Sequence, residues 1–105
     1  MEKKVTFDET GVLLESGPEN CTVAWADIDR IFVFKKDLFA VDLICLAIDA
    51  GDNRFDLDED FGGWLEFAEG ISEYLPECAK FEEWFEAVAF PPFETNPTRI
   101  YERPS

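Results

Sequence analysis

The arrangement of the whole chain depends most on residues 56–75, DLDEDFGGWLEFAEGISEYL. The stretch opens with acids, passes through Gly62 and Gly63, and then repeats apolar residues at helical spacing. That spacing predicts an amphipathic main helix over about 60–75, which Pro76 ends and which the glycine pair lets approach a sheet closely. The expected buried stripe is Phe61, Trp64, Leu65, Ala68, Ile71 and Leu75. Burial of such side chains contributes roughly 1.5–3 kcal/mol each, so the helix must belong to the core.

The acids ahead of this helix have two interpretations. Asp56, Asp58 and Asp60 alternate as ligands do at the start of a calcium loop. However, Phe61 stands at the sixth position, where such a loop needs Gly, and Phe67 stands at the twelfth, where it needs Glu. We therefore expect a capping turn, with Asp58 or Asp60 as the N-cap. A small carboxylate-based metal-binding protein or enzyme remains a remote alternative, and no metal or cofactor is predicted.

The chain before this stretch consists of short runs of apolar and alternating residues, separated by Gly, Pro and Asn. This pattern predicts about six strands over residues 3–57. A second short helix is expected over about 80–88, followed by an extended, packed tail over 89–105. The predicted fold is α+β, with a bent antiparallel sheet or partial barrel closed by the main helix, in a single domain. Asp42 lies inside an apolar run, and the sequence leaves open whether it is an edge residue or a buried acid.

Composition narrows the function classes. With 24 acids against 9 bases the net charge is −15, while 47% of the residues are hydrophobic, which argues against disorder. The charge disfavours nucleic acid and anionic membranes as partners. Histidine is absent, and we find neither a nucleophile motif nor a phosphate-binding loop, so no enzymatic activity is predicted. Three widely spaced cysteines and the lack of a signal-peptide pattern favour a cytoplasmic protein with reduced thiols.

The acids are unevenly distributed along the chain. Residues 49–86 contain thirteen acids and two bases, a local balance of −11. On the predicted helices these acids fall opposite the apolar stripes, so they form an acidic surface. Such a surface either only solubilises the protein or docks a basic protein by charge complementarity. The candidate partner-binding residues are Asp56, Asp58, Glu59, Asp60, Glu66, Glu69 and Glu73.

Several short motifs resemble those of a known bacterial family. The run from Trp25 to Ile31, with Asp27 and Ile28 between, resembles the W-x-D-I-x-x-I run of bacterial pleckstrin-homology-like domains. EDFGGW at 59–64, Trp84, PPFETN at 91–96 and YER at 101–103 are similar to motifs of small uncharacterised bacterial proteins, and together they cover nearly the whole chain. The resemblance implies a bent sheet plugged by a C-terminal helix and carries no activity. Phosphoinositide binding is not implied, because the first turn, DETG at 8–11, lacks basic residues.

Taken together, these features predict a non-enzymatic acidic module that binds another protein, most naturally a basic one. The alternative is an immunity-type inhibitor that blocks a basic toxin such as a nuclease. The sequence leaves self-association open.

Overall fold

A computed structural model describes residues 3–37, 42–89 and 97–104. Within strands and helices, four side chains are left outside this description, those of Asp37, Asp42, Ala87 and Ala89. The environment of the Asp42 carboxyl group, which the sequence left open, therefore lies outside the described structure. The described residues form seven strands and two α-helices.

The first three strands form a small antiparallel sheet, which we call sheet A. Strands β1 (Lys3–Phe7), β2 (Gly11–Ser16) and β3 (Glu19–Ala24) pair in sequence order. Alternate residues point inward, and the buried ones are Val5, Val12, Leu14 and Val23. A short 3-10 helix (Trp25–Asp27) leads out of sheet A.

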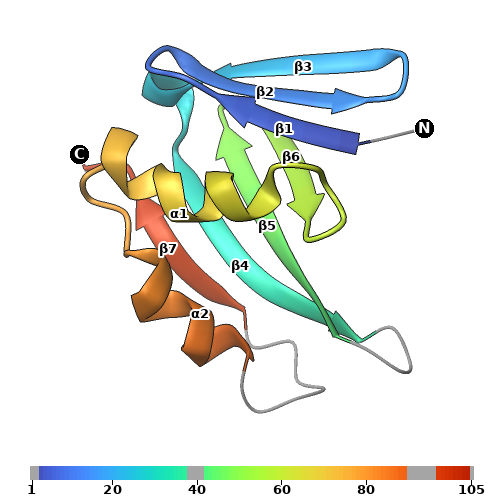
Figure 1. Cartoon of the computed structure of the whole chain (residues 1–105). Coiled ribbons are helices and arrows are strands. Elements are labelled where there is room, and N and C mark those ends of the chain that lie inside the picture. The colour runs from blue at the N-terminus through green and yellow to red at the C-terminus, as the bar shows by residue number, and fades with distance from the viewer. Residues whose placement is uncertain (1–2, 38–41, 90–96, 105) are drawn as a thin grey trace.

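The second sheet, sheet B, has four antiparallel strands in the order β6-β5-β4-β7 (Figure 1). Its strands are β4 (Arg30–Asp37), β5 (Asp42–Ala50), β6 (Asn53–Asp58) and β7 (Thr98–Glu102). Strand β7 joins β4 with a bulge, since Ile31 pairs with Tyr101 but Phe32 pairs with Arg99. The extra residue lets Ile100 and Tyr101 both be buried.

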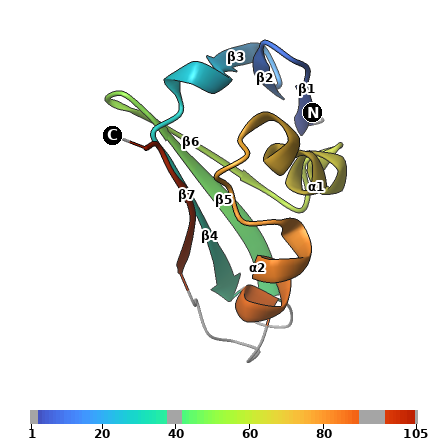
Figure 2. The ribbon, with the colours of Figure 1, turned by 90° about the vertical axis from the view of Figure 1, so that its left-hand side faces the viewer.

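Both helices cover the same face of sheet B, and sheet A closes the top of the molecule (Figures 1 and 2). Helix α1 (Trp64–Tyr74) packs against β1, and α2 (Phe81–Ala89) packs against β4 and β7. The core fills the space that these elements enclose. Trp25 joins its parts, because its ring stacks on Tyr74 at 5.0 Å and its Nε1 donates a hydrogen bond to the Asp8 carbonyl oxygen at 2.6 Å.

The α+β class and both helices are confirmed, but the single bent sheet of about six strands is not. Seven described strands divide into two sheets, and they do not form a closed barrel. The predicted extended tail supplies the seventh strand, β7. Of the tail residues expected to pack, Ile100 and Tyr101 are buried, whereas Phe90 and Phe93 lie outside the described residues.

Helix α1 is shorter than predicted and is rotated relative to the predicted stripe. Its buried residues are Trp64, Phe67, Ala68 and Ile71, and Phe61 and Leu75 are buried just outside its ends. Leu65, expected in the core, is 50% exposed, while Phe67 is fully buried. The predicted burial therefore holds for five of the six stripe residues and fails at Leu65.

The predicted N-cap of α1 is also wrong. The N-cap is Gly63, in the left-handed region at φ 82°, and no side chain caps the helix. The backbone of Gly62 instead pairs with β1: its carbonyl oxygen accepts from the Val5 N–H at 2.8 Å, and its N–H donates to the Lys3 carbonyl oxygen at 2.8 Å. A Cβ on Gly63 would lie 2.4 Å from the Val5 carbonyl oxygen. The glycine pair thus permits the close approach that the sequence predicted.

Candidate functional site

The seven predicted partner-binding acids do not form one continuous surface. Asp56 lies on the outer face of sheet B, away from the helices, because its neighbour Leu57 points into the core. Asp58 accepts a hydrogen bond from the Asp60 N–H at 2.9 Å, within the turn that follows β6. Glu59 accepts from the Ile44 N–H at 2.8 Å and donates its own N–H to the Ile44 carbonyl oxygen at 3.2 Å. The Asp58 and Glu59 carboxylates therefore hold the turn and strand β5 in place.

The acids of helix α1 behave differently. Glu66, Glu69 and Glu73 are exposed along its outer side and, among the described residues, make neither an ion pair nor a side-chain hydrogen bond. They recur three and four residues apart, so they form one row along the helix. Asp60, also exposed, precedes this row in the chain. The row is an uncompensated line of negative charge.

Helix α2 adds acids that the candidate set omitted. Glu82 and Glu86 are exposed and lie four residues apart on one side of the helix. Glu83 is exposed too, but its carboxylate accepts a hydrogen bond from the Lys80 N–H at 2.9 Å at the start of the helix. The same signal that selected the α1 row, acids opposite an apolar stripe, also marks Glu82 and Glu86.

A hollow of about 380 Å³ lies between the two helices. The first turn of α1 contributes Trp64, Leu65 and Glu66, and α2 contributes Phe81 and Phe85. The two phenylalanine rings stack at 4.9 Å and are only partly buried. Glu59 completes the lining next to the turn after β6. The hollow thus has an apolar floor and carboxylates at its rim.

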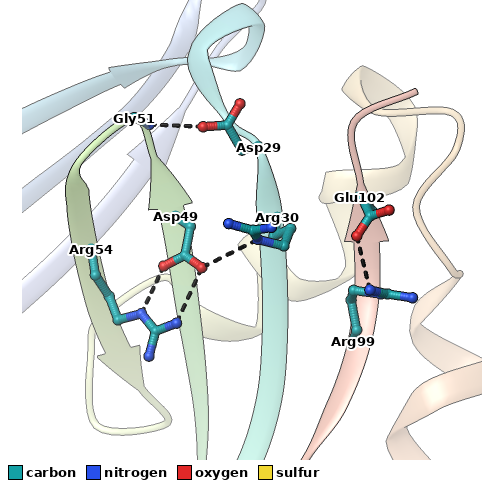
Figure 3. A network of polar contacts seen from close by, with 7 residues as sticks. All are labelled: Asp29, Arg30, Asp49, Gly51, Arg54, Arg99 and Glu102. Carbon is teal, nitrogen blue, oxygen red and sulfur yellow. Dashed lines mark hydrogen bonds and ion pairs between the residues drawn. The ribbon is translucent and has the colours of Figure 1, made fainter. Parts of the chain in front are cut away.

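The opposite face of sheet B has paired charges (Figure 3). Asp49 accepts two hydrogen bonds from the Arg54 guanidinium, at 2.7 and 3.1 Å, and lies 3.7 Å from Arg30. On the neighbouring strand, Arg99 donates to Glu102 at 2.8 Å. The hydrogen bonds from Arg54 and the charge of both arginines hold the pKa of Asp49 below its ordinary value, although the carboxylate is only 12% exposed. Three of the nine bases of the chain are therefore engaged on this face, opposite the helices.

The two buried thiols are not activated for chemistry. Burial raises the pKa of Cys45 to about 11 and that of Cys78 to about 12, which keeps both in the neutral thiol form. Cys21 is exposed on β3.

A further hollow of about 600 Å³ lies over sheet A and also lacks a reactive constellation. Asp8 is its one carboxylate, and hydrogen bonds from the Thr10 hydroxyl group and from the Thr10 and Gly11 N–H groups occupy one oxygen and lower its pKa. This carboxylate therefore holds the turn between β1 and β2.

The described residues contain neither a metal-ligand cluster nor a membrane-spanning helix. Residues 3–37, 42–89 and 97–104 contain no group of three Cys, Asp or Glu side chains arranged to hold a metal ion, and Asp56, Asp58 and Asp60 form no such group. In that same part of the chain, neither helix has the length and apolar content needed to cross a lipid bilayer.

Comparison of the chain with protein-family models, with curated proteins and with solved structures gave no match.

Proposed function

We propose that this protein is a non-enzymatic interaction module that binds a basic protein through the acidic side formed by α1 and α2. The observation that carries the proposal is the row Glu66, Glu69 and Glu73, which is exposed and has no ion-pairing partner among the described residues. Each of these carboxylates is fully available to a cationic partner.

The placement of the bases supports docking over simple solubilisation. On the outer face of sheet B, arginines neutralise Asp49 and Glu102 locally. Residues 59–86, which include both helices, contain nine acids and a single base. The negative potential is therefore concentrated on the helical side, where it attracts a basic protein and orients it before contact.

A second candidate function is that of an immunity-type inhibitor of a basic toxin such as a nuclease. The α1 row favours it, because carboxylates recurring along a rigid helix present negative charge at a regular spacing, as a nucleic-acid backbone does. A toxin gene beside the gene of this protein, and inhibition of that toxin by the purified protein, would support this function. Full toxin activity in the presence of excess protein would exclude it.

For the architecture, we propose a variant of the pleckstrin-homology-like arrangement. Two antiparallel sheets packed around one core, with α1 across them, support this proposal. The addition of β7 to sheet B after both helices departs from the order that the resemblance implies. We further propose that the protein acts in the cytoplasm, in keeping with its free cysteines.

The main proposal is tested by capture of a partner, followed by reconstitution with the purified partner. We expect the partner to be basic and its dissociation constant to rise steeply with salt concentration. The variant Glu69→Lys/Glu73→Lys should weaken binding at least tenfold.

The matched control is Glu9→Lys/Glu19→Lys, which changes the charge equally at exposed positions in the first turn and the third strand of the sheet A region. Equal loss of binding in both variants would show that only net charge matters and would refute docking on the helical side.

A further inference from the structure

We infer that the hollow between α1 and α2 receives one bulky apolar side chain from a Lys- or Arg-rich segment of the partner. This inference rests on the proposed function and adds the chemistry of the segment that is recognised. The hollow is then the centre of the interface, where the partner's apolar side chain is held. The exposed acids of the two helices form its acidic rim, which we call the acidic rows: Glu66, Glu69 and Glu73 on α1 and Glu82 and Glu86 on α2.

The exposure of Leu65 is the first observation that supports this inference. Leu65 is the one large hydrophobic side chain in residues 3–37, 42–89 and 97–104 that is exposed, at 50%. It occupies the first turn of α1 beside the buried Trp64 and faces the hollow. An exposed leucine alone has little meaning. Here it lines the same hollow as two partly buried phenylalanine rings from another helix, so the three side chains form an apolar strip within that hollow.

The geometry of the helices places this strip between acids. On α1, Leu65 lies between the buried side and Glu69, which is four residues on and about 40° further around the helix. On α2, Glu82 lies about 60° beyond Phe85, on the exposed side. An apolar centre with a charged rim is the usual anatomy of a protein interface. Because both rims are negative, the matching segment has an apolar residue flanked by cations.

The size of the hollow fits a side chain. Its volume of about 380 Å³ is near the lower end of the roughly 300–1,000 Å³ typical of small-molecule pockets. No described base lines it, so an anionic ligand would meet only carboxylates. A second copy of this chain would bring its own acidic rows against these rows, and like charges oppose that arrangement. A basic segment of another protein is the occupant that the charge selects.

The experiment uses two synthetic nonapeptides of equal charge, each with eight lysines and a central residue that is Trp in one and Ser in the other. Calorimetric titration at low salt gives their dissociation constants, and amide chemical shifts of the labelled full chain locate them. We expect the Trp peptide to bind about tenfold more tightly, with its largest shifts at Leu65, Phe81 and Phe85.

Variants of the protein make the assignment specific. Leu65→Gln should abolish the preference for Trp, while Leu65→Met should keep it, because methionine restores a flexible apolar side chain. Leu13→Gln removes a partly buried leucine from sheet A and should leave the preference unchanged. Circular dichroism should show the same helical content in all three variants.

The outcomes separate the two proposals. If both peptides bind equally tightly and shift residues of the α1 row, the acidic surface stands and the anchor is refuted. If neither peptide binds at low salt, both the anchor and the docking of basic proteins are refuted. If the chain dimerises and the dimer contact covers Leu65, the occupant is a second copy and the inference is overturned.

Discussion

Replacing Gly63 by alanine gives the sharpest test of how α1 joins the sheet. Gly63 and Gly51 both adopt left-handed backbone, with φ of 82° and 61°. An L-residue in this region is strained by about 1–2 kcal/mol, and alanine carries this strain at both positions. The gain from restricting the unfolded chain, about 0.4–1 kcal/mol, is the same at both positions and cancels in the comparison.

The surroundings distinguish the two glycines. A Cβ at Gly51 meets nothing within 4 Å, whereas a Cβ at Gly63 would lie 2.4 Å from the Val5 carbonyl oxygen. That contact must open, and the two backbone hydrogen bonds of Gly62 to β1 then lengthen or break. At about 0.5–1.5 kcal/mol each, they add roughly 1–3 kcal/mol to the loss. We therefore expect Gly63→Ala to cost about 1–3 kcal/mol more than Gly51→Ala.

Urea denaturation followed by tryptophan fluorescence measures both variants, because Trp64 follows Gly63 directly and Trp25 and Trp84 lie in the same core. With a slope of about 1–3 kcal/mol per molar urea, the two midpoints should differ by about 1 M. Equal midpoints for Gly63→Ala and Gly51→Ala would refute the close backbone approach between α1 and β1.

Three further predictions follow from individual side chains. Asp49→Asn should remove part of the loss of stability on acidification, because the lowered pKa of Asp49 stabilises the fold above the ordinary value of 3.8 and this contribution is lost as the pH falls through the lower folded value. Thermal unfolding between pH 2 and 7 measures the effect, with Asp52→Asn as the exposed control, and an unchanged fall of the melting temperature at low pH would contradict the prediction. Iodoacetamide should modify Cys21 alone in the folded protein, and all three thiols in urea, as counted by intact mass; rapid modification of Cys45 or Cys78 would show that their burial is wrong. Phe67→Ala should lower the free energy of unfolding by about 3–5 kcal/mol, and Leu65→Gln should change it by less than about 0.5 kcal/mol. A larger loss for Leu65→Gln than for Phe67→Ala in urea denaturation would show that Leu65, and not Phe67, is the buried residue.

The rotation of α1 shows where helical periodicity misleads. The predicted stripe included Phe61 and Leu75, which are buried but lie outside the helix. Counting Phe61 as a helical residue pulls the centre of the stripe toward Leu65 and away from Phe67. Periodicity identifies a buried face only over residues that share one helix, and the turn geometry of Gly62 and Gly63 decided where that helix began.

Strand β7 shows a different limit. Thr98–Glu102 follows a proline-rich stretch, and an extended tail and a strand have the same local signature there. What makes it a strand is its pairing with β4, more than sixty residues earlier in the chain. The buried Lys35, 2% exposed on β4, was likewise beyond local reasoning, since lysine is almost never fully buried.

The candidate site was predictable in charge but not in geometry. Acids opposite an apolar stripe correctly predicted an exposed row on α1. The same reasoning could not tell that Glu59 bonds to β5 or that Asp56 lies on the far face of sheet B, because both facts depend on how β6 pairs. Nor could it place Leu65 beside α2, since the contact between the helices is tertiary.

The late position of β7 has a consequence for synthesis on the ribosome. Strand β4 can pair with β5 as soon as both strands have been made, but its other edge has no partner until Thr98–Glu102 has been made. Pairings between distant segments form slowly, and an unpaired strand edge can recruit other chains. Arg103 then fastens the new strand, through its N–H to the Asp29 carbonyl oxygen at 2.8 Å and through its side chain to the carbonyl oxygen of Ile28. A nascent chain that stalls before this point would expose an open edge, and its strong negative charge would then be its main protection from aggregation.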